Sequence, residues 1–254
     1  MPIIDNKKKI IILYTRLSPH SYSLFENMLL NKYISLEIFA SCGNDIGNYF
    51  EYPNSKLKIH SLVSNNLKNF KKILITLFQQ DVEAIYISGW QYLTYIFCVS
   101  FIRILRKEVR VVSGFDDMYF PNKFKHKYLL PLFGNFFRLL APFAWVSGHH
   151  SNLFAKQMGY KNTEIIPNLL SAPNDYKYVD EHSNKFIFIG REDYVKGLDI
   201  LIAAWKIFRK EFKNWRLEIV GTKAYNNKKI GIYSHGYKDQ NFITRLLSNG
   251  GVGI

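Results

Sequence analysis

The sequence predicts an α/β protein made of two Rossmann-like domains. Short, continuously apolar runs alternate with segments of helical spacing, and this order is typical of a parallel sheet with helices on both faces. The pattern is interrupted by one polar stretch, Ser171 to Asn184, and then starts again. We therefore expect an N-terminal domain over residues 1–168, an interdomain linker over 169–184 and a second domain over 185–254.

Six runs account for the expected strands of the first domain. They are Ile10–Tyr14, Leu36–Phe39, Ala84–Ile87, Arg110–Val112, Ala144–Val146 and a last short strand at Thr163–Ile166. Small or turn-forming residues, such as Ser88-Gly89 and Ser147-Gly148, follow most of these runs. Ligands of open α/β sheets bind outside the carboxyl ends of the strands, so the function is expected at these loops.

The second domain is expected to begin with a strand, a helix and a strand. The strands are Phe186–Ile189 and Leu217–Val220, and the helix runs from about Leu198 to Phe212. Its apolar side chains fall at helical spacing on one side, which predicts packing against the sheet. These side chains are Leu198, Leu201, Trp205, Phe208 and Phe212.

Composition indicates a folded, intracellular protein. With 48% hydrophobic and 16% aromatic residues, the 254-residue chain has enough apolar surface for a core, which excludes a disordered tail. Its two cysteines, Cys42 and Cys98, provide neither a disulfide framework nor a structural zinc site. No export signal is recognisable at the N-terminus, and no residue grouping has metal-ligand spacing. We expect a cytoplasmic protein without a metal.

The formal net charge of +14 favours polyanionic partners or phosphate-bearing substrates. A biased composition rich in Lys, Ile and Asn explains part of this excess equally well. Nucleic acid is not expected, because no binding motif is present and the aromatic residues lie in apolar runs. The apolar stretches Tyr92–Ile102 and Tyr128–Val146 are too short or too interrupted to span a membrane. Peripheral contact with the anionic inner face of the cell membrane remains open.

The segment from Gly190 to Gly197 carries the clearest chemistry. It joins a buried strand to a helix N-terminus, where free backbone N–H groups and the helix dipole favour an anion. Arg191 adds a guanidinium that matches phosphate geometry, and Lys196 adds a movable ammonium. The two cations together are suited to clamp a diphosphate.

This Gly-Arg…Lys-Gly stretch resembles the start of the donor domain in family 4 (group 1) glycosyltransferases, which are retaining enzymes of the GT-B fold. Four further segments resemble the family. Trp215–Gly221 resembles its second donor-domain strand with the following glycine, and His235-Gly236-Tyr237 resembles its strand before a short helix. Ile165–Asn168 resembles its interdomain Ile-Pro-Asn element, and Ser147–Gly159 resembles its helix that begins with serine.

The resemblance implies transfer of a hexosyl-type sugar from a nucleotide-diphosphate donor to a hydroxyl acceptor, in polysaccharide or lipid-linked glycan biosynthesis. The nucleotide sugar is then a co-substrate, and no cofactor is implied. Arg191 and Lys196 would hold the diphosphate and stabilise its charge. Gly190, Gly197 and Gly221 would permit close approach of the donor.

Two departures from the family concern the first domain. The loop after the first strand lacks the family's paired glycines, and Ser18, His20 and Ser21 are candidates to donate hydrogen bonds to the donor instead. Asp116 matches the aspartate of the family's His-Asp pair, while the histidine position holds Phe115. Asp116 is therefore a candidate base for the acceptor hydroxyl, and a loop cap is an equally good interpretation.

Family members also continue into a glutamate pair that contacts the donor. That segment is not in this sequence, so the resemblance implies a donor domain that is incomplete, and hence a truncated chain. The alternative function is a non-catalytic remnant that at most binds a nucleotide diphosphate.

Overall fold

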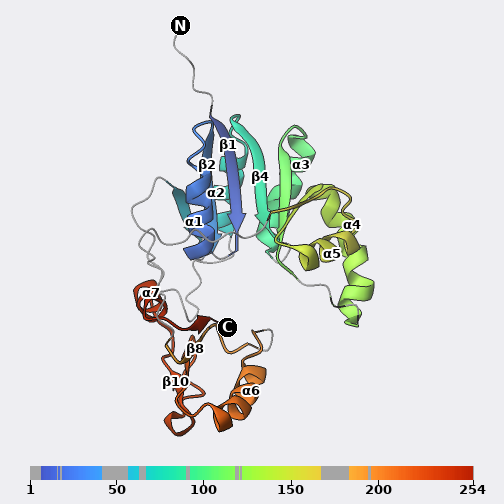
Figure 1. Cartoon of the computed structure of the whole chain (residues 1–254). Helices are drawn as coiled ribbons and strands as arrows, with labels where there is room; N and C mark the ends of the chain where they lie inside the picture. Colours follow the sequence, from blue (N-terminus) through green and yellow to red (C-terminus); the bar gives the residue numbers. More distant parts are fainter. Residues whose placement is uncertain are drawn as a thin grey trace. The chain divides into compact units, whose positions relative to one another are not determined.

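The computed structural model describes residues 7–15, 17, 19–41, 57–62, 67–89, 92–117, 120, 122–166, 183–193 and 196–253. The chain folds as two compact units, Met1–Ser171 and Ala172–Ile254 (Figure 1). Each unit is an α/β layer structure with one wholly parallel sheet, so the predicted fold class is confirmed. Most of the predicted linker, residues 169–184, lies outside the described residues.

The first unit has a seven-stranded sheet in the order β3-β2-β1-β4-β5-β6-β7, and all neighbouring strands are parallel. The chain moves outward from β1 to β3, then returns to β4 on the other side of β1. The carboxyl ends of β1 and β4 therefore form the switch point of the sheet. The strands are β1 Lys8–Tyr14, β2 Ile34–Ser41, β3 Lys58–Leu62, β4 Val82–Ser88, β5 Arg110–Phe115, β6 Phe143–Val146 and β7 Thr163–Ile165.

The six predicted strands are all present, and β3 is the one that the pattern missed. Its sequence, Lys-Ile-His-Ser-Leu, is largely polar because β3 lies at the edge of the sheet and is only partly buried. Such a strand lacks the continuous apolar run by which the central strands are recognised.

Helices cover both faces of this sheet unequally. Helix α1, Pro19–Met28, packs on one face against β1 and β2. The other face is covered by a layer of helices that encloses the larger core. These are α2 Leu67–Leu77, α3 Leu93–Leu105, α4 Leu130–Leu140 with the preceding π-helical turn Lys125–Leu129, and α5 His149–Gln157.

The second unit has a four-stranded parallel sheet in the order β10-β9-β8-β11. Helix α6 buries Leu198, Ile202 and Trp205 against it, and the Trp205 indole donates to the carbonyl of Ile230 (2.8 Å). The predicted amphipathic helix is therefore present, but its buried side also includes Ile202, and Phe212 of the predicted side is 45% exposed. The elements are β8 Lys185–Ile189, α6 Leu198–Glu211, β9 Arg216–Val220, a 3-10 turn Lys228–Ile230, β10 Ile232–Ser234, α7 Gln240–Ser248 and β11 Val252–Gly253.

A buried carboxylate, Glu37 on β2, contacts basic side chains from both neighbouring strands. Lys9 of β1 lies 3.0 Å away, and Lys58 and His60 of β3 lie 2.9 and 2.6 Å away. Burial by itself raises the pKa of this carboxyl, but the hydrogen bonds from Lys58, His60 and Lys9 outweigh it and lower the pKa to about 2. The charged form of Glu37 therefore stabilises the fold.

We expect Glu37→Gln to lower the free energy of unfolding by roughly 2 kcal/mol at neutral pH, after allowance for solvent screening of Lys58. The folded pKa lies below the ordinary value of 4.5, so this stability is present above pH 4.5 and is lost as the pH falls toward about 2. Urea unfolding across that range should show a weaker acid dependence in the variant. Glu83→Gln, which breaks an exposed pair with Lys8, is the matched control and should change little. An unchanged acid dependence in Glu37→Gln would contradict this account.

Candidate active site

The loop between β8 and α6 holds the two predicted phosphate-binding cations at the carboxyl edge of the second sheet. The Gly190 amide donates to the carbonyl of Val220 (2.9 Å), which fixes the start of the loop beside β9. The Asp193 amide then donates to the carbonyl of Arg191 (2.9 Å), and the Lys196 amide donates to that of Asp193 (2.9 Å). Backbone hydrogen bonds therefore shape the loop and leave the side chains of Arg191 and Lys196 outside it.

Both cations are accessible to a ligand. The Arg191 side chain is 64% exposed and lies 4.0 Å from the Asp193 carboxylate, a surface pair of small energy. Lys196 is exposed, and within the described part of the chain no ion pair engages it. An anion at this loop would meet two charges that are not committed to a buried partner.

The N-terminus of α6 adds backbone N–H groups, which carry no net charge, to the same anion site. Gly197 caps this 14-residue helix in the left-handed region, with φ +64°, and no side chain caps the first turn. The space where a Cβ of Gly197 would lie is open. The first N–H groups of α6 and the positive end of its dipole are therefore available to an anion.

Gly221, which sequence reasoning assigned to donor binding, has a structural role at the end of β9. Its φ is +118°, and a Cβ there would lie 2.0 Å from the carbonyl oxygen of Gly190. Its amide donates to the carbonyl of Gly236 (2.8 Å). Gly221 thus lets the loops after β8 and β9 approach each other, and its contact with a donor stays a prediction.

Thr222 is a residue of this edge that the sequence did not single out. Its hydroxyl donates to the carboxylate of Glu192 (3.0 Å) and accepts from the amide of Ala224 (3.1 Å). These bonds connect the loop after β9 to the loop that carries Arg191. The sequence could have indicated Thr222 through its position, because it follows directly after a predicted strand and the glycine that ends it.

Asp116 follows β5, the strand next to β4 of the switch point, and its charge acts on two tyrosines, Tyr14 and Tyr86. Burial raises the pKa of Tyr14. A hydrogen bond with Ser21 partly lowers this pKa, and the charge of Asp116 raises it further. Burial also raises the pKa of Tyr86, followed by the effects of Tyr14 and Asp116. The two rings stack with centroids 6.3 Å apart. Gly114 of β5 leaves the space that the Tyr86 hydroxyl occupies, since a Cβ there would lie 1.7 Å from it.

The carboxyl ends of β1 and β4 are held together by side chains. The Ser88 hydroxyl accepts from the amide of Thr15 (2.8 Å) and donates to the Thr15 hydroxyl (3.3 Å). The buried hydroxyl of Tyr95 donates to the carbonyls of Tyr14 (3.0 Å) and Phe39 (3.2 Å). Ser88 was expected at this edge, but its partner Thr15 and the role of Tyr95 could not be predicted, because only the strand order makes these residues neighbours.

The remaining predicted residues have the following places. Ser18 lies outside the described residues, as does the side chain of His20, whose backbone is in the first turn of α1. Ser21 is 3% exposed and bonds to Tyr14. Phe115, at the family's histidine position, is buried against Phe154 and other aromatic rings of the core.

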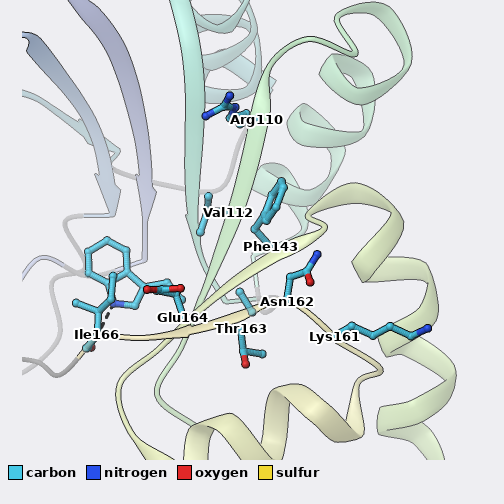
Figure 2. A pocket seen from close by; sticks show the side chains of 10 residues that line it. Arg110, Val112, Phe143, Lys161, Asn162, Thr163, Glu164 and Ile166 are labelled. Atoms are coloured by element: carbon cyan, nitrogen blue, oxygen red, sulfur yellow. Dashed lines mark hydrogen bonds between the residues drawn. The ribbon is translucent and has the colours of Figure 1, made fainter.

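The first unit also has an open hollow of about 720 Å³ on the sheet face that carries α1. Its lining begins at the first residues of β5 and β6 and in the turn before β7, as Figure 2 shows. It includes Arg110, Phe143, Lys161 and Glu164. Most of this lining lies away from the loops that hold Asp116, so the hollow is not assigned to the candidate site.

The residues that the structure describes contain no group of three or more His, Cys, Asp or Glu side chains placed to hold a metal ion. No helix among them has the length and apolarity needed to cross a bilayer.

Comparisons with known proteins connect the second unit to a family. Residues 177–249 match the model of "Glycosyl transferases group 1". A comparison with curated proteins gave no significant match.

Solved structures share the fold of the whole chain at low identity. One is "Trehalose-6-phosphate from E. coli bound with UDP-2-fluoro glucose", with TM-score 0.64, 11% identity, and coverage of 96% of this chain and 77% of that chain. A second concerns "enzymatic glycosyltransfer with retention" by trehalose-6-phosphate synthase, with TM-score 0.58, 12% identity and coverage of 96% and 76%. A third is a putative UDP-N-acetylglucosamine 2-epimerase from Listeria monocytogenes, with TM-score 0.56, 10% identity and coverage of 95% and 72%. These matches show the GT-B fold.

We expect Gly221→Ala to destabilise the second unit by roughly 1–3 kcal/mol, because the methyl group would collide with the Gly190 carbonyl at a positive φ. Gly253→Ala is the control, since no atom lies within 4 Å of its Cβ position. Thermal unfolding followed by circular dichroism checks both variants. Equal melting temperatures for the two would show that the strand ends can separate without cost.

Proposed function

Because residues 177–249 match the model of the group 1 glycosyltransferases and the chain has the GT-B fold, we propose that it transfers a sugar from a nucleotide-diphosphate donor to a hydroxyl acceptor, with retention of configuration. The observation that carries the proposal is the β8–α6 loop, where Arg191 and Lys196 flank an uncapped helix N-terminus. A diphosphate is the anion that this combination of donors fits best.

The loop contributes to the reaction through electrostatics. As the bond between the anomeric carbon and the phosphate oxygen breaks, the electron pair stays on the diphosphate and its negative charge grows. Arg191 binds the phosphate oxygens through its planar fork, and Lys196 follows the charge on a flexible stem. Comparable preorganised groups contribute roughly 3–4 kcal/mol each to transition-state stabilisation. Two such cations perform the role that a metal ion has in other transferases, so we propose a metal-free reaction with the nucleotide sugar as co-substrate.

On the acceptor side, Asp116 takes the proton of the acceptor hydroxyl. It follows β5 directly and is exposed at the carboxyl edge of its sheet. Tyr14 and Tyr86 beside it have raised pKa values, so both hydroxyls stay protonated at neutral pH and neither competes as a base. Asp116 is therefore the ionisable acceptor of protons in this cluster.

The substrate class follows from the family and from the neighbours. A structural neighbour is described with UDP-2-fluoro glucose bound, which makes UDP-hexoses the first donors to test. We propose a hexosyl transfer in polysaccharide or lipid-linked glycan biosynthesis. The place of action is the cytoplasm, with peripheral contact at the inner face of the membrane.

Calorimetric titration with UDP and GDP tests the donor site. We expect one nucleotide to bind and Arg191→Ala and Lys196→Ala each to weaken binding about tenfold or more, because each removes a charge-assisted contact to phosphate. Lys206→Ala removes the same charge from the exposed face of α6, two turns from its N-terminus, and should leave the affinity unchanged. A folded chain that binds neither nucleotide would refute the donor site. Nucleotide binding without transfer to any acceptor would favour the alternative of a non-catalytic remnant.

The variant Asp116→Asn tests whether Asp116 accepts the proton of the acceptor hydroxyl or only caps its loop. We expect nucleotide affinity to be unchanged and sugar transfer, measured as nucleotide release from the preferred donor, to fall by roughly 10²–10⁴-fold. Asp81→Asn, an exposed aspartate before β4 on the opposite edge, is the matched control. A normal transfer rate in Asp116→Asn would assign this residue to the loop alone.

A further inference from the structure

Helices α3 and α4 have apolar side chains on two opposite faces. Their inner faces, which include Tyr95 and Ile102 on α3 and Phe137 on α4, are buried in the core of the first unit. Their outer faces are apolar as well, although they are open to solvent. The exposed side chains are Leu93, Phe97, Phe101 and Ile104 on α3, and Leu132, Phe133, Phe136 and Leu139 on α4. We call these eight residues the apolar face.

The two exposed stripes lie next to each other in the same layer. The spacing is three or four residues along α3 and, apart from the adjacent Leu132 and Phe133, three residues along α4, so each stripe runs along one side of its helix. Helix α3 packs between α2 and α4, and the rings of Phe70 on α2 and Phe101 on α3 are 6.1 Å apart. The apolar face is thus one surface formed by neighbouring helices, and large exposed surfaces of this kind mark interaction sites.

The helical segments that carry the apolar face, and those next to them, are basic. Within α2, α3, the π-helical turn and α4, the sequence has no aspartate or glutamate. Helix α2 contributes exposed Lys71 and Lys72, and α3 contributes Arg103. Before α4, the Lys127 ammonium lies over the ring of Tyr128, with 5.1 Å to its centroid. These helical segments therefore combine exposed aromatic and aliphatic groups with cations and carry no carboxylate of their own.

We propose that the apolar face docks the protein onto an anionic lipid bilayer. Aromatic and leucine side chains would enter the boundary between headgroups and acyl chains, while Lys71, Lys72 and Lys127 would meet the anionic headgroups. Helix α3 has 13 residues and α4 has 11, about half of what a spanning helix needs, so both lie on the bilayer rather than cross it.

The docking surface borders the acceptor side of the proposed reaction. In a parallel α/β sheet each helix begins at the carboxyl edge, so α3 starts after β4, and the π-helical turn follows the loop of Asp116. If the proposed function holds, the bilayer would present a lipid-linked acceptor near this edge. The binding of lipid itself does not depend on that function, and the experiment below measures the two separately.

Vesicle co-sedimentation of the whole chain tests the proposal. We expect binding to vesicles of phosphatidylcholine mixed with phosphatidylglycerol, little binding to phosphatidylcholine alone, and a decline with added salt. Leu132→Gln/Leu139→Gln removes two leucines that are 69% and 70% exposed, and should weaken binding about tenfold or more. The matched control is Ile200→Gln/Ile207→Gln on α6, with side chains 71% and 70% exposed, which should bind like the wild type.

A second pair of variants tests the charges. Lys71→Gln/Lys72→Gln should weaken binding to anionic vesicles, and Lys206→Gln/Lys210→Gln, with the same loss of charge on α6, should not. Calorimetry with UDP on the same variants should give the wild-type affinity, which keeps a failure of the donor site distinct from a failure of docking. Equal vesicle binding by Leu132→Gln/Leu139→Gln and the wild type would overturn the proposal. A second result would also overturn the proposal. If sedimentation velocity showed that the wild type is a dimer and that Leu132→Gln/Leu139→Gln is a monomer, the apolar face would bind a second copy of the chain.

Discussion

Parallel pairing of a central strand on both of its sides is the constraint on which each unit depends. In the first unit β1 pairs with β2 and β4, and in the second β8 pairs with β9 and β11. The chain builds the sheet first on one side of this strand and later on the other. The loops at the carboxyl ends of the two neighbouring strands therefore run apart, which leaves room for a ligand. Several candidate residues lie at these strand ends, with Asp116 directly after β5 and Gly190 and Arg191 directly after β8.

The strand ends are held close by different chemistry in the two units. In the first, the Ser88 hydroxyl connects β4 to Thr15 after β1. In the second, the absence of a side chain at Gly221 lets the backbone after β9 reach that of Gly190. Both solutions hold neighbouring strand ends close together at the carboxyl edge. This matters for electrostatic catalysis, because preorganised donors need not be reordered when charge develops.

The helical layer of the first unit shows how one apolar sequence serves two environments. Helix α3 is apolar nearly all round, a composition that in isolation indicates complete burial. The sheet can cover only one side of it, and its neighbours α2 and α4 cover the flanks. The remaining side faces outward, and α2, α3 and α4 have no carboxylate of their own, a combination that is unfavourable in water and favourable against lipid.

The sequence by itself determined the fold class, six of the seven strands of the first sheet, the amphipathic face of α6 and the Gly-Arg…Lys-Gly loop, because apolar periodicity and a compact motif are local properties of the chain. It could not identify Tyr14 and Tyr86 as neighbours of Asp116, or the packing role of Gly221, because each depends on the order in which strands pair. Nor could it tell which side of α3 faces outward. Those features were decided by tertiary structure alone, since residues distant in sequence meet only when the sheet is assembled.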